Sequence, residues 1–140
     1  MELIAGLITA IAIIGLGYAT RQGQSVQFYS SVLIVIALAY VLFAAMEEAP
    51  RTIAVESAIA AVFVVVAVVG TQWRNGRSAG MILAGGLAAH GGYDLLHSAV
   101  VTNPVVPAWW PLFCGVVDVL LAGWVVRLGL WDGATGRGGE

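Results

Sequence analysis

The chain is poor in charge. Only 10% of its 140 residues are Asp, Glu, Lys or Arg, and lysine is absent. Soluble globular domains carry roughly 25% charged residues, so this composition excludes a soluble globular fold. Hydrophobic residues make up 60% of the chain, and the mean hydropathy is +0.93. The sequence therefore predicts a polytopic membrane protein. Its arginines form no basic cluster, which argues against nucleic acid as a partner.

Cysteine is nearly absent as well. The single cysteine, Cys114, excludes an internal disulfide and any metal site made of several cysteines. An isolated cysteine in an apolar segment is typically a small buried hydrophobic residue. A neighbouring imidazole would instead make its thiol reactive, and on that alternative Cys114 is a candidate ligand-binding residue.

Apolar segments dominate the rest of the chain, and each is close to the roughly 20 residues that cross a bilayer. They are residues 3–19, 27–46, 52–70, 79–101 and 108–128. Short connections that contain turn formers or prolines separate them. The first segment lacks the positively charged start of a cleaved signal, so it is expected to span the membrane. We predict one all-α domain, a bundle of five transmembrane helices over residues 1–131, with a flexible tail at 132–140.

The arginines fall mainly on one side of this topology. Arg51 lies on one side, and the other five are Arg21, Arg74, Arg77, Arg127 and Arg137. Because cytoplasmic loops are enriched in arginine, the N-terminus is expected outside and the C-terminus in the cytoplasm. The expected location is the bacterial inner membrane.

Ionisable residues interrupt the fourth apolar segment. His90, Asp94 and His97 are spaced i, i+4 and i+7, which places them within about 60° of one another on a helix. At 1.5 Å per residue, Asp118 lies at the depth of His90, and Glu56 at the depth of Asp94. Ionisable groups inside a membrane are costly and usually functional. We therefore predict a polar site in the outer half of the membrane, in which His90 and Asp118 are paired.

This polar layer is rich in carboxylates and has a single arginine, Arg51. The carboxylates are Glu47, Glu48, Glu56, Asp94 and Asp118. Ionised acids so close together would repel one another, and burial adds to their cost. Neutralisation requires a bound cation, protonated carboxyl groups, a charged histidine or water from the outer side.

Three interpretations follow from this layer. His90, Asp94, His97 and Asp118 form a candidate metal site, with Zn or Fe as the expected ion. With a metal bound, Glu56 would act as the general base. Without a metal, His90 or His97 would transfer protons together with a carboxylate. The candidate catalytic residues are therefore Glu56, His90, His97 and Asp118. The third interpretation is a structural hydrogen-bond network that fastens the helices together.

Small and aromatic residues flank the ionisable face. Tyr93 is a candidate hydrogen-bond donor to a ligand, and Gly86 could leave room for that ligand beside His90. Close helix packing is the alternative explanation for the glycines. A ridge at four-residue spacing lies on nearly the opposite face and is expected to contact a neighbouring helix. It consists of Gly80, Ala84, Ala88 and Gly92.

The segment DLLH at 94–97, followed by VPAWWPLFC at 106–114 and by Asp118, resembles an uncharacterised family of small bacterial multi-pass membrane proteins. The resemblance implies no activity. The architecture is also similar to that of membrane sterol isomerases, which are small bundles with His and carboxylates in a pocket open to lipid, but no motif is shared. The translocator protein family also has five helices, but its Trp/Pro pattern is missing here.

The sequence thus favours a small membrane enzyme, or a lipid-ligand binding protein derived from one. Its partner would be a membrane lipid or another apolar small molecule. A proton or divalent-metal transporter subunit is the first alternative, although no ionisable residue lies in the inner half of the spans and a homo-oligomer would be needed to complete a path. A structural or assembly subunit of the membrane is the second.

Overall fold

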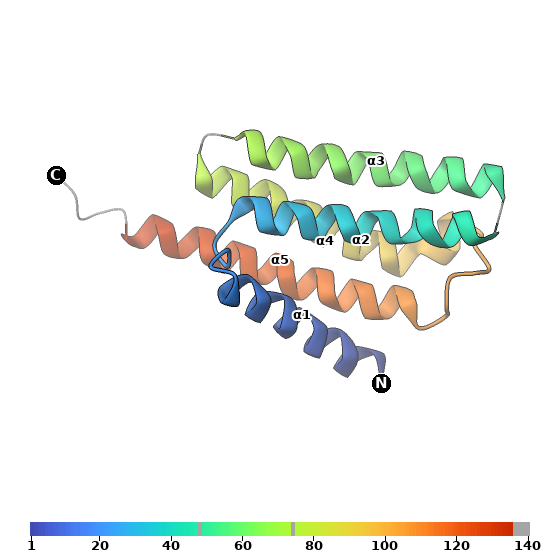
Figure 1. Ribbon diagram of the computed structural model, residues 1–140, viewed down its shortest axis with the longest axis horizontal. Helices are drawn as coiled ribbons and strands as arrows, with labels where there is room; N and C mark the ends of the chain where they lie inside the picture. Colours follow the sequence, from blue (N-terminus) through green and yellow to red (C-terminus); the bar gives the residue numbers. More distant parts are fainter. Residues whose placement is uncertain (48, 74, 136–140) are drawn as a thin grey trace.

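The computed structural model describes residues 1–47, 49–73 and 75–135. These residues form an all-α bundle, and no strand occurs in the described part (Figure 1). The five helices are α1 (Glu2–Ala19), α2 (Val26–Glu47), α3 (Pro50–Gln72), α4 (Gly76–Val100) and α5 (Trp110–Thr135). The predicted five-helix fold is confirmed. Helix α5 continues to Thr135, into the segment predicted as a flexible tail, and residues 136–140 lie outside the described residues.

Four of these helices are long and apolar enough to cross a membrane, namely α1, α2, α3 and α5. Helix α4 has 25 residues, which is also sufficient for a crossing, but its histidines, aspartate and glycines lower its hydropathy. It packs against α2, α3 and α5, so its polar residues face other helices. The bundle is therefore built around its least apolar helix.

Helix direction alternates along the chain, and this defines the two ends of the bundle. The N-terminal end holds residue 1, the connection between α2 and α3, and the 101–109 connection between α4 and α5 (Figure 1). The C-terminal end holds the α1–α2 and α3–α4 connections. Arg51 starts α3 at the N-terminal end, whereas Arg21 and Arg77 lie at the C-terminal end. This separation is the one expected from the sequence, and the orientation in the membrane stays a prediction.

Local sequence explains the helix boundaries at these connections. Pro50 occupies the first turn of α3, where its missing N–H is not needed. Asn75 caps α4, and its side-chain oxygen accepts hydrogen bonds from the backbone N–H groups of Arg77 and Ser78. Pro104 and Pro107 lie in the 101–109 connection, between the end of α4 and the start of α5.

Glycine positions set how closely α4 approaches its neighbours. A Cβ atom at Gly91 would lie 3.2 Å from the Cβ of Asp118 and 3.3 Å from the carbonyl oxygen of Gly115. A Cβ at Gly86 would lie 2.8 Å from Val66 and 2.9 Å from Leu33. Both glycines therefore permit helix contacts that a larger residue would obstruct.

The ridge predicted on the opposite face of α4 is only partly a contact surface. Gly80 and Ala84 are buried, but Ala88 is exposed and a Cβ at Gly92 would meet no atom within 4 Å. The close approach to α5 is made by Gly91, which lies between the directions of Gly80 and Ala84 on the helix.

Candidate functional site

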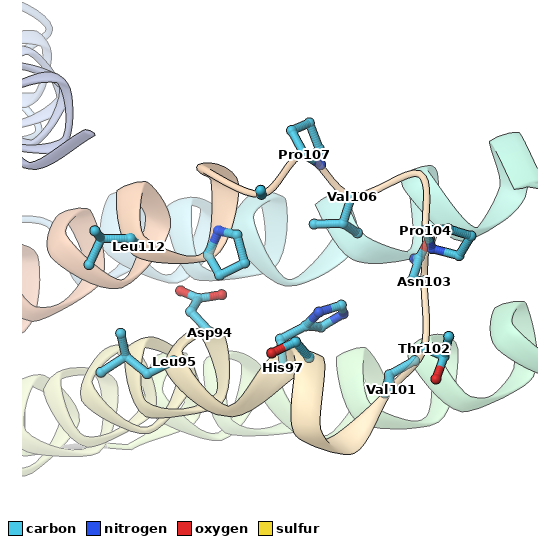
Figure 2. A pocket seen from close by; sticks show the side chains of 13 residues that line it. Asp94, Leu95, His97, Val101, Thr102, Asn103, Pro104, Val106, Pro107 and Leu112 are labelled. Carbon is cyan, nitrogen blue, oxygen red and sulfur yellow. The ribbon is translucent and has the colours of Figure 1, made fainter. Parts of the chain in front are cut away.

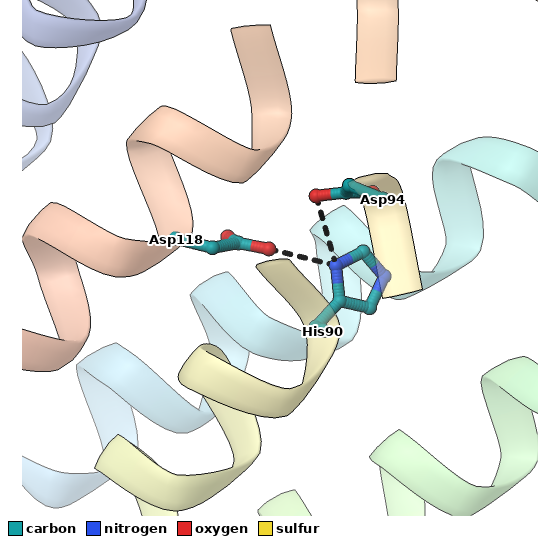
Figure 3. A group of neighbouring side chains, drawn as sticks. All are labelled: His90, Asp94 and Asp118. Atoms are coloured by element: carbon teal, nitrogen blue, oxygen red, sulfur yellow. Dashed lines mark hydrogen bonds and ion pairs between the residues drawn. The ribbon is translucent and has the colours of Figure 1, made fainter. Parts of the chain in front are cut away.

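The first feature of the site is a buried pair between α4 and α5. The Nδ1 atom of His90 lies 2.7 Å from the Oδ2 atom of Asp118, and both side chains are buried (Figure 3). Close packing at Gly91 brings the two backbones near enough for this contact. The pairing predicted from helix depth is present in the structure.

Asp94 is the third member of this group. Its Oδ2 atom lies 3.6 Å from the Nδ1 atom of His90, too far for a hydrogen bond (Figure 3). Both of its carboxylate oxygens are buried and have no hydrogen-bond partner among the described residues, and the residue is 1% exposed. One potential ligand atom from each of His90, Asp94 and Asp118 lies within 4.8 Å of the others. We call these three residues the His90 group.

His97 belongs to a different group. Its Nε2 atom lies 2.8 Å from Oε1 of Glu56, which comes from the first turns of α3. Glu56 also accepts a hydrogen bond of 2.7 Å from the Tyr93 hydroxyl and a longer one of 3.5 Å from the Asn103 amide. We call these four residues the Glu56 group. The residues predicted to act as one site thus divide into two neighbouring groups, and His97 lies with Glu56 instead of with Asp94.

Aromatic rings pack on both histidines. Tyr40 of α2 stacks on the His97 ring with a centroid distance of 4.1 Å and an angle of 17°. Phe63 of α3 meets the His90 ring edge to face at 4.6 Å. These ring contacts with α2 and α3 fix the plane of each imidazole within the bundle. Every helix except α1 contributes to the two groups or to the rings that pack on them.

A cavity of about 490 Å³ adjoins both groups at the N-terminal end of the bundle. Asp94 and His97 line it from α4, and the 101–109 connection covers it (Figure 2). The Asp94 side chain points from α4 towards α5 (Figure 2). Leu95 and Leu112, on these two helices, also line the cavity and are 62% and 40% exposed. The cavity therefore reaches the apolar surface of the bundle between α4 and α5.

The three predicted ligand-binding residues do not line this cavity. The space beside Gly86 is filled by Val66 and Leu33, so packing explains this glycine. Cys114 is buried, and the Tyr93 hydroxyl is used by Glu56. Glu48 and the side chain of Glu47 lie outside the described residues.

Sequence reasoning missed Tyr40 and Asn103. Tyr40 stands in an otherwise apolar helix, where a tyrosine has the ordinary interpretation of a core or interface residue. Asn103 precedes a proline in a connection, which is typical of a turn residue. Only its burial, at 7% exposure, distinguishes it from other turn residues.

No protein-family model, no curated protein and no solved structure matches this chain. The function must therefore be argued from the two groups and the cavity.

Proposed function

We propose that the His90 group binds one divalent metal ion, Zn²⁺ or Fe²⁺, and that the protein is a small membrane enzyme acting on an apolar substrate. The observation that carries the proposal is Asp94. Its carboxylate is buried, has no hydrogen-bond partner among the described residues and points towards a histidine and a second aspartate. A buried carboxylate without a compensating partner is strongly unfavourable, so a bound cation would stabilise this position.

The charges of the group support a divalent ion. Among the described residues, the only basic side chain within ion-pairing distance of either aspartate is His90. A neutral imidazole ligand and two ionised aspartates carry two negative charges together. A divalent cation neutralises them and replaces the solvation that both carboxylates lose on burial.

The distances also fit. In a tetrahedral site with ligand bonds of about 2.0–2.1 Å, neighbouring donor atoms lie about 3.3 Å apart. The two distances from His90 Nδ1, 2.7 Å to Asp118 and 3.6 Å to Asp94, lie on either side of that value. One ligand atom from each of the three residues lies within 4.8 Å of the others, so the two carboxylates would move towards the ion on binding.

Three protein ligands and an adjoining cavity are typical of a catalytic metal site, because a fourth position stays open for water or substrate. An ion there would polarise a carbonyl group or activate a water molecule. The apolar surface beside Leu95 and Leu112 favours a substrate that arrives from the lipid. The arginine distribution supports a cytoplasmic C-terminus, and the location we propose is the bacterial inner membrane.

Metal analysis of protein purified without a polyhistidine tag tests the proposal. We expect about one Zn or Fe per chain in the natural sequence. Asp94→Asn and Asp118→Asn should lose it, whereas His97→Gln should keep it because His97 lies outside the His90 group. Folding of each variant is checked by gel filtration in detergent. A metal-free natural protein that also binds no added Zn²⁺ or Fe²⁺, or full metal content in Asp94→Asn, would contradict the proposal.

A further inference from the structure

We propose that His97 is a catalytic base that Glu56 positions, and that it accepts the proton of a hydroxyl group carried into the cavity by a membrane amphiphile. The inference deepens the proposed function and rests on it only in treating the cavity as the substrate site. It assigns His97 a role other than that of metal ligand. It also makes Glu56 a positioning residue, in place of the general base expected from the sequence.

The hydrogen bonds of Glu56 determine how His97 holds its proton. A carboxylate only accepts hydrogen bonds, so the His97 Nε2 atom at 2.8 Å must be the donor. The Tyr93 hydroxyl donates to the other oxygen of Glu56 at 2.7 Å, which fixes the carboxylate. A neutral His97 therefore carries its proton on Nε2 and has a free electron pair on Nδ1. In hydrolytic triads a carboxylate orients a histidine base in the same way, but with the roles of the two ring nitrogens exchanged.

The position of His97 relative to the cavity supports a direct role for this residue. His97 lines the cavity and Glu56 does not, so the histidine stands between the carboxylate and any bound molecule. Asp94 lines the same cavity three residues earlier in α4. Side chains three residues apart on a helix are neighbours, with Cβ atoms about 5–6 Å apart. A small polar group in the cavity could therefore contact both side chains.

The proton transfer has a simple balance. The O–H bond of the bound hydroxyl breaks, its electron pair stays on oxygen, and an N–H bond forms at Nδ1 of His97. The positive imidazolium that results is compensated by the Glu56 carboxylate at 2.8 Å. The oxygen becomes a nucleophile next to Asp94.

The lining of the cavity indicates an amphiphile. The lining includes three buried polar residues, Asp94, His97 and Asn103, and two exposed ones, Ser98 and Thr102. Apolar side chains line the side between α4 and α5. The two exposed leucines on that side, Leu95 and Leu112, would face lipid chains in a membrane. A molecule with an apolar chain and a hydroxyl end fits both surfaces at once.

The small number of histidines in the chain makes the proposal testable. The chain contains two histidines only, so each can be followed separately. In nitrogen NMR of histidine-labelled protein, His97 should show a proton on Nε2 and none on Nδ1. Glu56→Gln should yield both tautomers, because an amide can donate or accept. Tyr93→Phe is the matched control, since it removes a hydrogen bond from Glu56 but keeps the ring that packs on His97, and it should keep the single tautomer.

Chemical modification tests access to the base. Diethyl pyrocarbonate should modify His97 several-fold faster than His90, because only His97 lines the cavity. Decanol in lipid nanodiscs should slow the reaction at His97, whereas decane, which lacks the hydroxyl, should have little effect. Modification of His90 first, equal protection by decane, or a proton on Nδ1 of His97 would overturn the proposal.

The two proposals can fail separately. Added Zn²⁺ should shift the NMR signals of His90 and leave the tautomer of His97 unchanged. An unshifted His90 would count against the metal site alone. A His97 that is unreactive or unprotected by decanol would count against the base alone, whatever the metal content.

Discussion

The two halves of the bundle interior differ in how completely their polar atoms are paired. In the half near the C-terminal end, the Ser30 hydroxyl donates to the Ala67 carbonyl at 2.8 Å. The Tyr29 hydroxyl donates to the Gly23 carbonyl and accepts from the Trp124 indole. In the half near the N-terminal end, buried oxygen and nitrogen atoms lack partners within the described part of the chain. They belong to Tyr40, Asp94, Asn103, Trp110 and Asp118.

The difference assigns stability mainly to the half near the C-terminal end and the candidate site to the half near the N-terminal end. Buried polar groups are nearly always paired, and exceptions concentrate where a ligand or strain is part of the function. The C-terminal half, with an apolar core around Leu33 and Leu83, holds the helices together. The N-terminal half keeps polar groups that make the fold less stable and that a ligand could satisfy.

The largest expected effect on stability comes from the C-terminal half. Leu33 is fully buried, and Leu33→Ala should lower the free energy of unfolding by about 2–5 kcal/mol because it leaves a cavity. Heating in detergent with a thiol-reactive dye measures this, since the single cysteine, Cys114, is buried until the chain unfolds. The metal content of the folded fraction should not change, and its loss would show that the two halves are not independent.

A substitution in the N-terminal half should act in the opposite direction. Asp94→Asn removes a buried charge, and the new amide can donate a hydrogen bond to Asp118. We expect the metal-free protein to become more stable by about 1–3 kcal/mol. The same dye assay in the presence of a chelator measures this gain. A metal-free Asp94→Asn protein that unfolds at a lower temperature than the natural one would contradict the division into two halves.

The smallest expected effect concerns a paired polar group of the C-terminal half. Ser30→Ala removes the hydrogen bond to Ala67 and should cost about 0.5–1.5 kcal/mol. Thermal unfolding followed by circular dichroism is sufficient to detect it. Ser31→Ala is the matched control, because the Ser31 hydroxyl is exposed and bonds only within its own helix. Equal effects of the two substitutions would mean that the hydrogen bond from Ser30 of α2 to Ala67 of α3 adds nothing to the stability of the bundle.

Much of the fold could be predicted because its signals are local. Apolar segments, Pro50 and the turn residues between helices define the five helices from neighbouring positions in the chain. The pairing of His90 with Asp118 also followed from depth alone, since both positions could be counted from helix ends.

The division of the site into two groups could not be predicted in the same way. Helix periodicity places His90, Asp94 and His97 on one face, but it does not say which neighbouring helix each side chain meets. That depends on contacts between distant parts of the chain, such as Gly91 against Gly115. Asp94 and His97 differ by three residues, and this small rotation directs one side chain to α5 and the other to Glu56 on α3. Asn103 joins the site through the path of a connection that has no periodic pattern.

The packing of α1 has a consequence for the order in which the protein is made. Its main contact is with α5, where Gly6 lies against Val116 and the Phe113 carbonyl. Helix α1 leaves the ribosome before α5, the helix that fixes its place in the bundle. Until α5 is inserted, α1 lacks the contact of Gly6 with Val116 and keeps its smaller contact with α2, where Gly17 lies against Phe28. A chain stopped before residue 110 would therefore leave α1 without its main partner.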